Sequence, residues 1–178
     1  SLLDIASIAR QYGHVQEVIV QNFRAKPETA AAQRDDATTD RHRAALAVAR
    51  LVLPSATSVQ APPNLHHESA LQQLLDAGVD DWGGVSPITP DHVNPERPWP
   101  ELERLSELTA ASGLTLKSRL TVHPRYVRQA QSWIDGHVLP HTAALADASG
   151  LAGSARPQPG QWQAEESVGG YAPVGKGE

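Results

Sequence analysis

The sequence predicts an α/β protein of about four βα units, equivalent to half of a (β/α) barrel, followed by a tail. First, short β-branched runs alternate with amphipathic helical segments over residues 1–146, a pattern typical of a parallel sheet. Second, polar side chains gather just after the predicted strands, where barrel enzymes keep their chemistry. Third, 178 residues suffice for one domain but not for an ordinary eight-unit barrel.

The first unit combines a strand over Val15 to Phe23 with a helix from about Asp40 to Leu53. The β-branched centre of the strand suits burial. Apolar residues recur at helical spacing in the helix until Pro54 ends it. The opening LLDIASIARQYG resembles the later part of a helix with no cap before it. We therefore expect the chain to begin inside a larger protein.

The second unit combines a strand over Ser58 to Leu65 with a helix from about His67 to Asp76. Apolar residues occupy one face of this helix. They are Ala70, Leu71, Leu74 and Leu75. Gly78 stands where a helix C-terminal cap belongs, so a sharp turn is expected before the next strand.

The third unit begins with a strand over Asp80 to Ser86, which leads through a long loop to a helix from about Trp99 to Ala111. The fourth contains a strand over Leu114 to Val122 and a helix from about Pro124 to Ile134. That last helix is expected to bury its apolar side chains. They are Tyr126, Val127, Ala130, Trp133 and Ile134. A short helix near Pro140 to Ala146 completes the ordered part.

Composition excludes several classes of protein. The net charge of -5 argues against nucleic-acid binding, which needs a basic face. No apolar run approaches the roughly 20 residues that span a bilayer, so a soluble cytoplasmic protein is expected. The absence of Cys excludes disulfides and thiolate metal ligands within this chain. Residues 147–178 are polar and rich in Gly and Pro, and we expect a linker or disordered tail there.

Three motifs at the strand ends carry a resemblance to a known family. They are GHVQEVIVQNFRAKP (Gly13 to Pro27), QAPPNL (Gln60 to Leu65) and DDWGGVSPITPDHVNPERPWP (Asp80 to Pro100). In this order and spacing, roughly Ser1 to Ala146 resembles the FO synthase (7,8-didemethyl-8-hydroxy-5-deazariboflavin synthase) family, within its first radical SAM module. The resemblance implies the C-terminal half of a radical SAM barrel.

The resemblance also implies an activity and cofactors. It implies a lyase that forms the deazaflavin chromophore of coenzyme factor 420 from a tyrosine-derived hydroxybenzyl adduct of 5-amino-6-(D-ribitylamino)uracil, with loss of ammonia. Such enzymes use S-adenosylmethionine and a [4Fe-4S] cluster held by a CxxxCxxC motif. This chain has no Cys, so the cluster ligands are expected in a missing N-terminal half-barrel. The fragment alone is expected to be inactive, and a second synthase module after the tail stays open.

Side chains just past the strands are expected to converge on one cavity. The expected substrate-binding residues are Asn22, Arg24, Gln60, Asn64, Trp82, Gly83, Gly84, Ser86 and Thr89. The amides can both donate to and accept from a uracil and a ribityl chain. The glycines permit close approach of a planar ligand, and Trp82 can stack on a ring. Asp91 and His92 are the candidate acid–base residues.

A structural alternative exists for most of these residues. Asn22 could cap a turn, and Arg24 could pair with Asp35 or Asp36. Trp82 could belong to the barrel interior, with Gly83-Gly84 in a strand bulge, and Asp91 could cap a helix.

Two functional alternatives stay open. One is a barrel lyase without iron that uses a divalent metal with Asp80, Asp81, Asp91 and His92, and the other is a non-catalytic binding fragment. No metal site is expected from the histidines, because His66-His67 diverge on a helix and the pair His137 and His141 lacks a third ligand.

Overall fold

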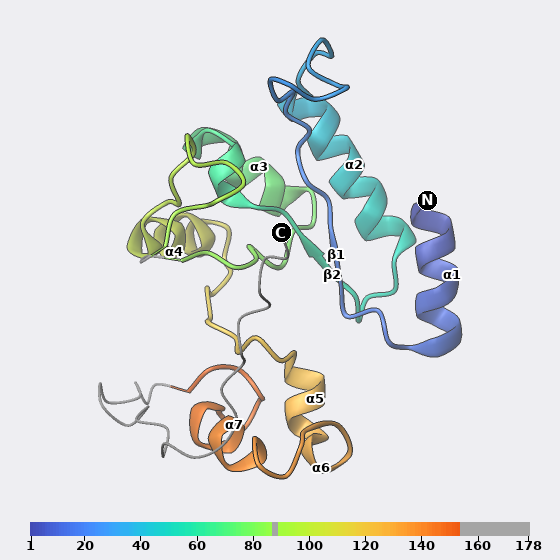
Figure 1. The fold of residues 1–178 in the computed structure, drawn as a ribbon, viewed down its shortest axis with the longest axis vertical. Coiled ribbons are helices and arrows are strands. Elements are labelled where there is room, and N and C mark those ends of the chain that lie inside the picture. Colours follow the sequence, from blue (N-terminus) through green and yellow to red (C-terminus); the bar gives the residue numbers. More distant parts are fainter. Residues whose placement is uncertain (87–88, 154–178) are drawn as a thin grey trace, which may run out of the picture. The chain divides into compact units, whose positions relative to one another are not determined.

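The computed structural model describes residues 1–86 and 89–153, which divide between two compact units, residues 1–116 and residues from 117 onward (Figure 1). The first unit contains α1 (Leu2–Tyr12), β1 (Glu17–Ile19), α2 (Thr39–Val52), β2 (Ser58–Gln60), the 3₁₀ helix η1 (Pro63–Leu65), α3 (Glu68–Asp76) and α4 (Leu102–Ala111). The second contains α5 (Pro124–Arg128), α6 (Ala130–Trp133) and α7 (Leu139–Leu145). No helix among the described residues is long and apolar enough to cross a membrane.

The sheet of the first unit is parallel. β1 pairs with β2 in a register that sets Val18 opposite Val59, and Val20 N extends the ladder by donating to Gln60 O over 2.9 Å. A third segment joins β2 through a parallel bridge between Gln60 and Asp81. Three successive segments therefore run in the same direction side by side, an arrangement compatible with part of an α/β barrel.

The helices of the first unit follow one another around the sheet. α1 packs on α2, α2 on α3, and α3 on α4 (Figure 1). In a (β/α) barrel, consecutive helices are neighbours in this way in the outer ring. Two βα connections, from β1 to α2 and from β2 to α3, are formed as the sequence predicts.

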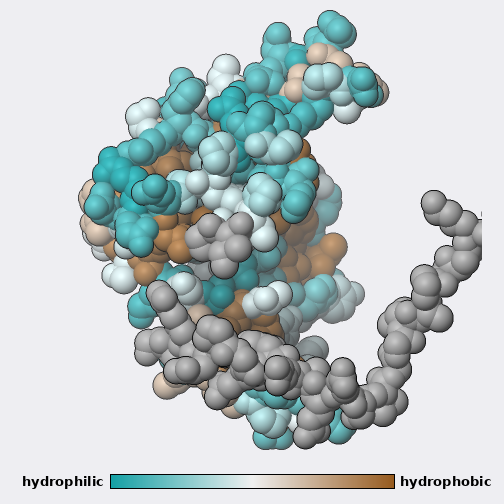
Figure 2. Space-filling view, turned by 60° about the vertical axis from the view of Figure 1, so that its left-hand side comes forward, coloured by the Kyte–Doolittle hydropathy of each residue, from teal (hydrophilic) through white to brown (hydrophobic). Residues whose placement is uncertain are grey.

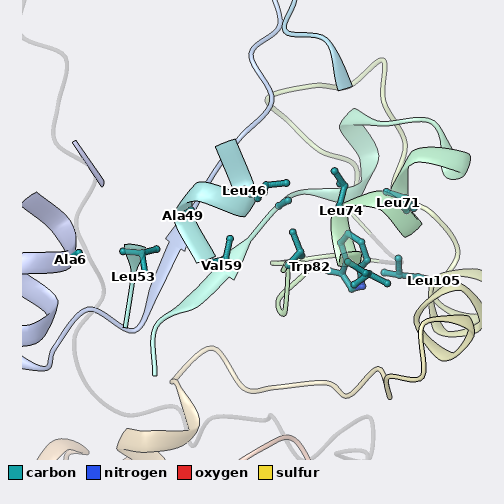
Figure 3. Packing of buried hydrophobic residues seen from close by; sticks show 12 residues of the cluster. Ala6, Leu46, Ala49, Leu53, Val59, Leu71, Leu74, Trp82 and Leu105 are labelled. Atoms are coloured by element: carbon teal, nitrogen blue, oxygen red, sulfur yellow. The ribbon is translucent and has the colours of Figure 1, made fainter. Parts of the chain in front are cut away.

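The hydrophobic core lies between these helices and β2. α2 contributes Leu46 and Ala49, α3 contributes Leu74, and Val59 points into the same cluster from β2 (Figure 3). The predicted inward face of α3 is confirmed, since all four of its apolar residues are buried. Leu105 of α4 packs at the far side of the cluster, beside the indole ring of Trp82 in the third segment.

Arg50 holds the turn that precedes the third segment. Its Nε donates to Gly78 O over 2.9 Å, and its Nη2 pairs with Asp80 Oδ2 at 2.7 Å. Gly78 has φ +99°, and a Cβ there would lie 2.7 Å from Arg50 Cγ. The predicted glycine turn is therefore confirmed. Both the positive φ and the close approach of Arg50 explain why residue 78 is a glycine.

The strands are shorter than predicted. β1 keeps only the centre of Val15 to Phe23, and in Ser58 to Leu65 the strand gives way to η1 after Pro62. Asp80 to Ser86 forms a single bridge at Asp81. The strand predicted over Leu114 to Val122 is wrong, because residues 114–122 have no strand pairing. A strand forms only where a neighbour satisfies its backbone groups, and no neighbouring strand pairs with this alternating segment.

The helix predicted from Pro124 to Ile134 is broken into α5 and α6 at Gln129, which has φ -114° and ψ 34°. Its predicted burial is also wrong, since Trp133 is 60% exposed. Tyr126 and Trp133 instead contact each other edge to face, with ring centroids 5.0 Å apart. Between residues 117 and 153 no strand is present on which these short helices could pack, and the two aromatic rings pack on each other instead.

The start of the chain and the first part of the predicted tail differ from expectation. α1 has Ser1 as its N-cap, in a capping box with Asp4. Most of the predicted tail, residues 154–178, lies outside the described residues. Residues 147–153 are described, and there Asp147 Oδ1 accepts from Leu151 N over 3.0 Å. Ala152 N donates to Ser118 O over 3.1 Å, which ties this segment to the start of the second unit.

Leu74→Ala should lower the free energy of unfolding by about 2–5 kcal/mol, because the side chain is fully buried and its loss leaves a cavity. Leu51→Ala is the matched control, since that leucine is 85% exposed, and it should change the value by less than about 0.5 kcal/mol. Urea unfolding followed by tryptophan fluorescence measures both. Equal effects of the two substitutions would contradict the described core.

Candidate functional site

Hydrogen bonds join the residues that follow β1, the residues that follow β2 and the long loop after Asp81 to one another. Arg24 Nη2 donates to Leu65 O over 3.0 Å, which ties the exit of β1 to the exit of β2. Asn64 Nδ2 donates to Asp91 Oδ2 over 2.8 Å, which ties β2 to the long loop. Because the strands are parallel, these contacts all lie at their carboxyl ends. We call this cluster the strand-exit site and define it by Asn22, Arg24, His42, Gln60, Asn64 and His66.

Asn22 is the most unusual member of the strand-exit site. It is 3% exposed, and neither Oδ1 nor Nδ2 has a hydrogen-bond partner among the described residues. The alternative role as a turn cap is therefore not what the structure shows. An unpaired buried amide costs about 1–3 kcal/mol. A polar ligand that pairs with both atoms would remove that cost.

Asn64 is buried and only partly satisfied. Its Nδ2 also donates to Arg97 O over 3.1 Å, whereas its Oδ1 has no partner among the described residues. These two bonds orient the amide and leave its Oδ1 available to accept a hydrogen bond. Like Asn22, it combines burial with unused hydrogen-bonding capacity, and both residues were predicted from the sequence as substrate-binding.

Asp91 anchors the long loop. Its Oδ1 accepts from Val93 N at 2.8 Å and from Asn94 N at 3.1 Å, in addition to the bond from Asn64 to Oδ2. Hydrogen bonds from Asn94 and then Asn64 lower the pKa of Asp91 to about 2. The carboxylate is therefore ionised at neutral pH and poor at exchanging protons. Its neighbour His92 is exposed, so this geometry favours a capping role over the acid–base role that the sequence suggested.

Gln60 and Gly83 fit against each other. Gln60 Nε2 donates to Asp81 Oδ1 over 3.2 Å, and Gly83 N donates to the same oxygen over 2.7 Å. Gly83 has φ +84°, and a Cβ there would lie 2.9 Å from Gln60 Nε2. Gly83 thus permits the approach of Gln60. Around Gly84 a Cβ would meet nothing within 4 Å, so the space for a ligand expected at the glycines exists only there.

Trp82 lies in the core, apart from the strand-exit site. It is 6% exposed and lies beside Leu105 (Figure 3), and its Nε1 donates to Thr109 Oγ1 over 3.2 Å. This placement agrees with the interior alternative and does not support stacking on a ligand. Ser86 and Thr89 are joined to each other, since Thr89 N donates to Ser86 Oγ over 3.0 Å. They flank two residues outside the described ranges.

Arg24 has the surface partner that was considered as its alternative role. Its Nη1 pairs with Asp36 Oδ2 at 2.9 Å. Ala25 N and Arg24 both donate to Asp36, and these bonds lower the pKa of Asp36 below its ordinary value. Arg24 thus clamps the two strand exits, and its charge is largely compensated.

Two histidines at this site were missed by the sequence prediction. His42 and His66 are buried, and their rings stack with centroids 4.8 Å apart and planes 6° from parallel. His42 Nε2 donates to Val20 O over 2.6 Å. The signal for His42 was present, because it precedes Leu46 by four residues and shares its helix face. His66 carried no comparable periodic signal.

Burial sets the charge of this histidine pair. Desolvation lowers the pKa of His42. For His66, desolvation and then the charges of His42, Arg24 and His67 lower the pKa to about 4. Both rings are therefore neutral at neutral pH, and each nitrogen either donates or accepts.

The carboxylates of the metal-dependent alternative have other partners. Asp80 Oδ1 accepts from Val59 N over 2.8 Å, and its other oxygen pairs with Arg50. Asp81 accepts from Gln60 Nε2, so the two neighbouring carboxylates have different partners. The described residues contain no group of three or more His, Asp and Glu side chains that could hold a metal ion. Within residues 1–86 and 89–153, these carboxylates are thus not arranged as the metal-dependent alternative requires.

Comparison with known proteins gives close relatives. A protein named FO synthase from Nocardia farcinica is 55% identical over 153 residues, which make up 85% of this chain and 18% of the relative. An FO synthase from Mycobacterium leprae is 53% identical over 169 residues, or 94% of this chain and 20% of the relative. The 7,8-didemethyl-8-hydroxy-5-deazariboflavin synthase from Methanococcus aeolicus is 48% identical over 139 residues, or 78% of this chain and 38% of the relative.

The chain thus spans about a fifth of the length of the first two relatives. No family model matches the chain. No solved structure matches it either.

Gly83→Ala should destabilise the protein by about 1–2 kcal/mol, because an L side chain is strained at positive φ and its Cβ would displace Gln60. Gly84→Ala is the neighbouring control and should be nearly neutral. Urea unfolding of both variants measures the difference. A neutral Gly83→Ala would show that Gln60 does not hold this position.

Acid titration should reveal the anchoring role of Asp91. Its folded pKa, about 2, lies below the ordinary value of 3.8, so its stabilisation is complete above about pH 4. It is lost as the pH falls from there through 2. The free energy of unfolding of Asp91→Asn should therefore depend less steeply on pH in that window, and it should be lower than that of the wild type at pH 6. Parallel curves would contradict this assignment.

Proposed function

We propose that this chain, which is homologous over most of its length to a segment of the FO synthases, forms part of the substrate-binding barrel of an enzyme of FO (deazaflavin) biosynthesis. The names of its relatives and their 48–55% identity support this proposal. The observation that supports it in the structure is the strand-exit site, where buried amides with unused hydrogen-bonding atoms follow the carboxyl ends of two paired parallel strands. Barrel enzymes bind their substrates at that end.

We further propose the reaction that the family resemblance implies. It is radical SAM lyase chemistry on a hydroxybenzyl adduct of 5-amino-6-(D-ribitylamino)uracil, with closure to the deazaflavin and loss of ammonia. A uracil presents alternating N–H and C=O groups, and a ribityl chain presents hydroxyls. The amides of Asn22 and Asn64 can pair with both kinds of group, since a carboxamide donates and accepts.

The residues of this chain do not fit an iron–sulfur cluster. Thiolates are the usual cluster ligands, and the chain contains no Cys. We therefore assign the [4Fe-4S] cluster and most contacts to S-adenosylmethionine to polypeptide outside these residues. The cluster and S-adenosylmethionine supply the radical when bound. This chain would bind and orient the substrate.

The surface of the first unit supports a covering polypeptide. Within the described residues β1 pairs only with β2, and Ile19 and Phe23 are 54% and 40% exposed along that strand and its exit. Leu51 of α2 is 85% exposed, and hydrophobic surface is visible on the face shown in Figure 2. We propose that a further half-barrel covers this edge. A cytoplasmic location is part of the same proposal, whereas a second synthase module after the tail stays open.

The activity test uses the full-length protein encoded by the reading frame that contains this chain. After anaerobic reconstitution with iron and sulfide, it should form FO from the adduct in the presence of S-adenosylmethionine. Mass spectrometry detects the product. Failure of a cluster-loaded protein to form FO would overturn the proposed reaction.

Asn22→Leu should separate binding from stability. Replacing the unpaired buried amide by an apolar side chain of similar volume should raise the free energy of unfolding by about 1 kcal/mol. The same change should weaken binding of 5-amino-6-(D-ribitylamino)uracil at least about tenfold, the equivalent of one lost hydrogen bond. Calorimetric titration and urea unfolding provide the two values.

The matched control is Gln21→Leu, at the exposed neighbouring position, which should leave affinity unchanged. Wild-type affinity in Asn22→Leu would remove Asn22 from the substrate site.

A further inference from the structure

The stacked pair of His42 and His66 is not explained by the fold alone. Both rings are buried, and they lie 4.8 Å apart in nearly parallel planes. Core positions of a helix and a strand exit are normally filled by apolar side chains. A pair of imidazoles at such positions introduces four ring nitrogens that must be paired or left without partners.

The hydrogen bonds of His42 fix how the pair is arranged. A carbonyl oxygen only accepts, so the 2.6 Å contact with Val20 O places the proton of His42 on Nε2. This bond holds the His42 ring against the end of β1. The plane of His66 is in turn set by the stack. His66 therefore has a defined orientation even though its Nε2 is buried and has no partner among the described residues.

We propose that His66 is a substrate-binding residue whose Nε2 forms a hydrogen bond with an uncharged polar part of the substrate, alongside Asn22 and Asn64. This inference rests on the proposed function. It adds a residue that follows directly on the QAPPNL motif. It also assigns this part of the site to the ribityl–uracil portion, and not to a charged group.

Three observations favour an uncharged ligand. Most of the side chains with unused atoms here are neutral, two carboxamides and two imidazoles, beside a single cationic one, the Nε of Arg24. The guanidinium of Arg24 is already paired with Asp36 and bonded to Leu65 O. Lys26, which also follows β1, pairs with Glu96 at 2.8 Å. An anion would have to compete for these cations, whereas hydroxyl, carbonyl and N–H groups match the neutral side chains directly.

The electrostatics around His66 agree with this assignment. Besides His42 on α2, the charged group that affects it is Arg24 at the exit of β1, and His67 is its chain neighbour. All of these oppose protonation, and burial opposes it most strongly. A neutral imidazole at this point can accept or donate one hydrogen bond without placing a buried charge beside the substrate.

Two substitutions at His66 and one at its neighbour test the inference in the full-length protein. His66→Phe keeps a planar ring on His42 but lacks the hydrogen bond, so the Kd for 5-amino-6-(D-ribitylamino)uracil should rise about tenfold. His66→Gln restores a donor and an acceptor and should recover most of the affinity. His67→Gln changes an exposed histidine and should have no effect. Thermal unfolding checks that each variant is folded.

Two further ligands identify which part of the substrate His66 contacts. The affinity for S-adenosylmethionine should be the same in the wild type and His66→Phe. The 5′-phosphate ester of the ribitylaminouracil should bind the wild type more weakly than the uncharged compound. Stronger binding of the phosphate ester, or a changed affinity for S-adenosylmethionine, would overturn the assignment to an uncharged portion.

The inference and the proposed function fail in different ways. If the wild type binds the ribitylaminouracil and folded His66→Phe binds it equally well, the role of His66 is wrong and the proposed function stands. If the wild type forms FO from the adduct but does not bind the ribitylaminouracil, this inference fails alone. If it forms no FO, the proposed function fails and this inference fails with it.

Discussion

The parallel pairing of β1, β2 and the segment at Asp81 is the constraint on which the rest of the first unit depends. Because all three run in one direction, their exits meet at one edge of the sheet. The bonds from Arg50 to Gly78 O and Asp80 then fix the turn before the third segment. The burial of Leu74 and Val59 holds the helices over the strands. Polar residues far apart in sequence become neighbours only through this arrangement.

The sequence predicted the helices of the first unit well and the strands less well. The apolar spacing of α2 and α3 predicts both helices, Pro54 marks the end of α2, and Gly78 marks the end of α3. All of these signals are local in sequence. Strand extent depends on partners, so Leu114 to Val122, with the alternation of a strand, forms none in the described structure. The broken helix at Gln129 has the same origin, since the described part of its unit, residues 117–153, supplies no sheet on which to bury Trp133.

At the site, chain position led to two residues that the structure shows to be buried. Asn22 and Asn64 follow strands, and both have unused polar atoms, while their substrate-binding role stays a prediction. Trp82 was predicted to bind substrate and Asp91 to act as an acid–base residue, yet the structure shows Trp82 packed in the core with Leu105 and Asp91 capping Val93 and Asn94. The histidine stack could not be foreseen, because it joins a helix position to a strand exit 24 residues further along the chain. Only tertiary structure brings such pairs into contact.

The bond from Asn64 to Asp91 has a consequence for selectivity. A free carboxamide can rotate by a half-turn and exchange its oxygen for its nitrogen, which lets it serve either kind of partner. Asn64 has lost that freedom, because both hydrogens of its Nδ2 are directed to Asp91 and to Arg97 O. At the proposed substrate site Asn64 would therefore offer only an acceptor, which a group bringing only lone pairs would not match. Asn22, with neither end of its amide hydrogen-bonded, would still be able to turn either end towards a ligand.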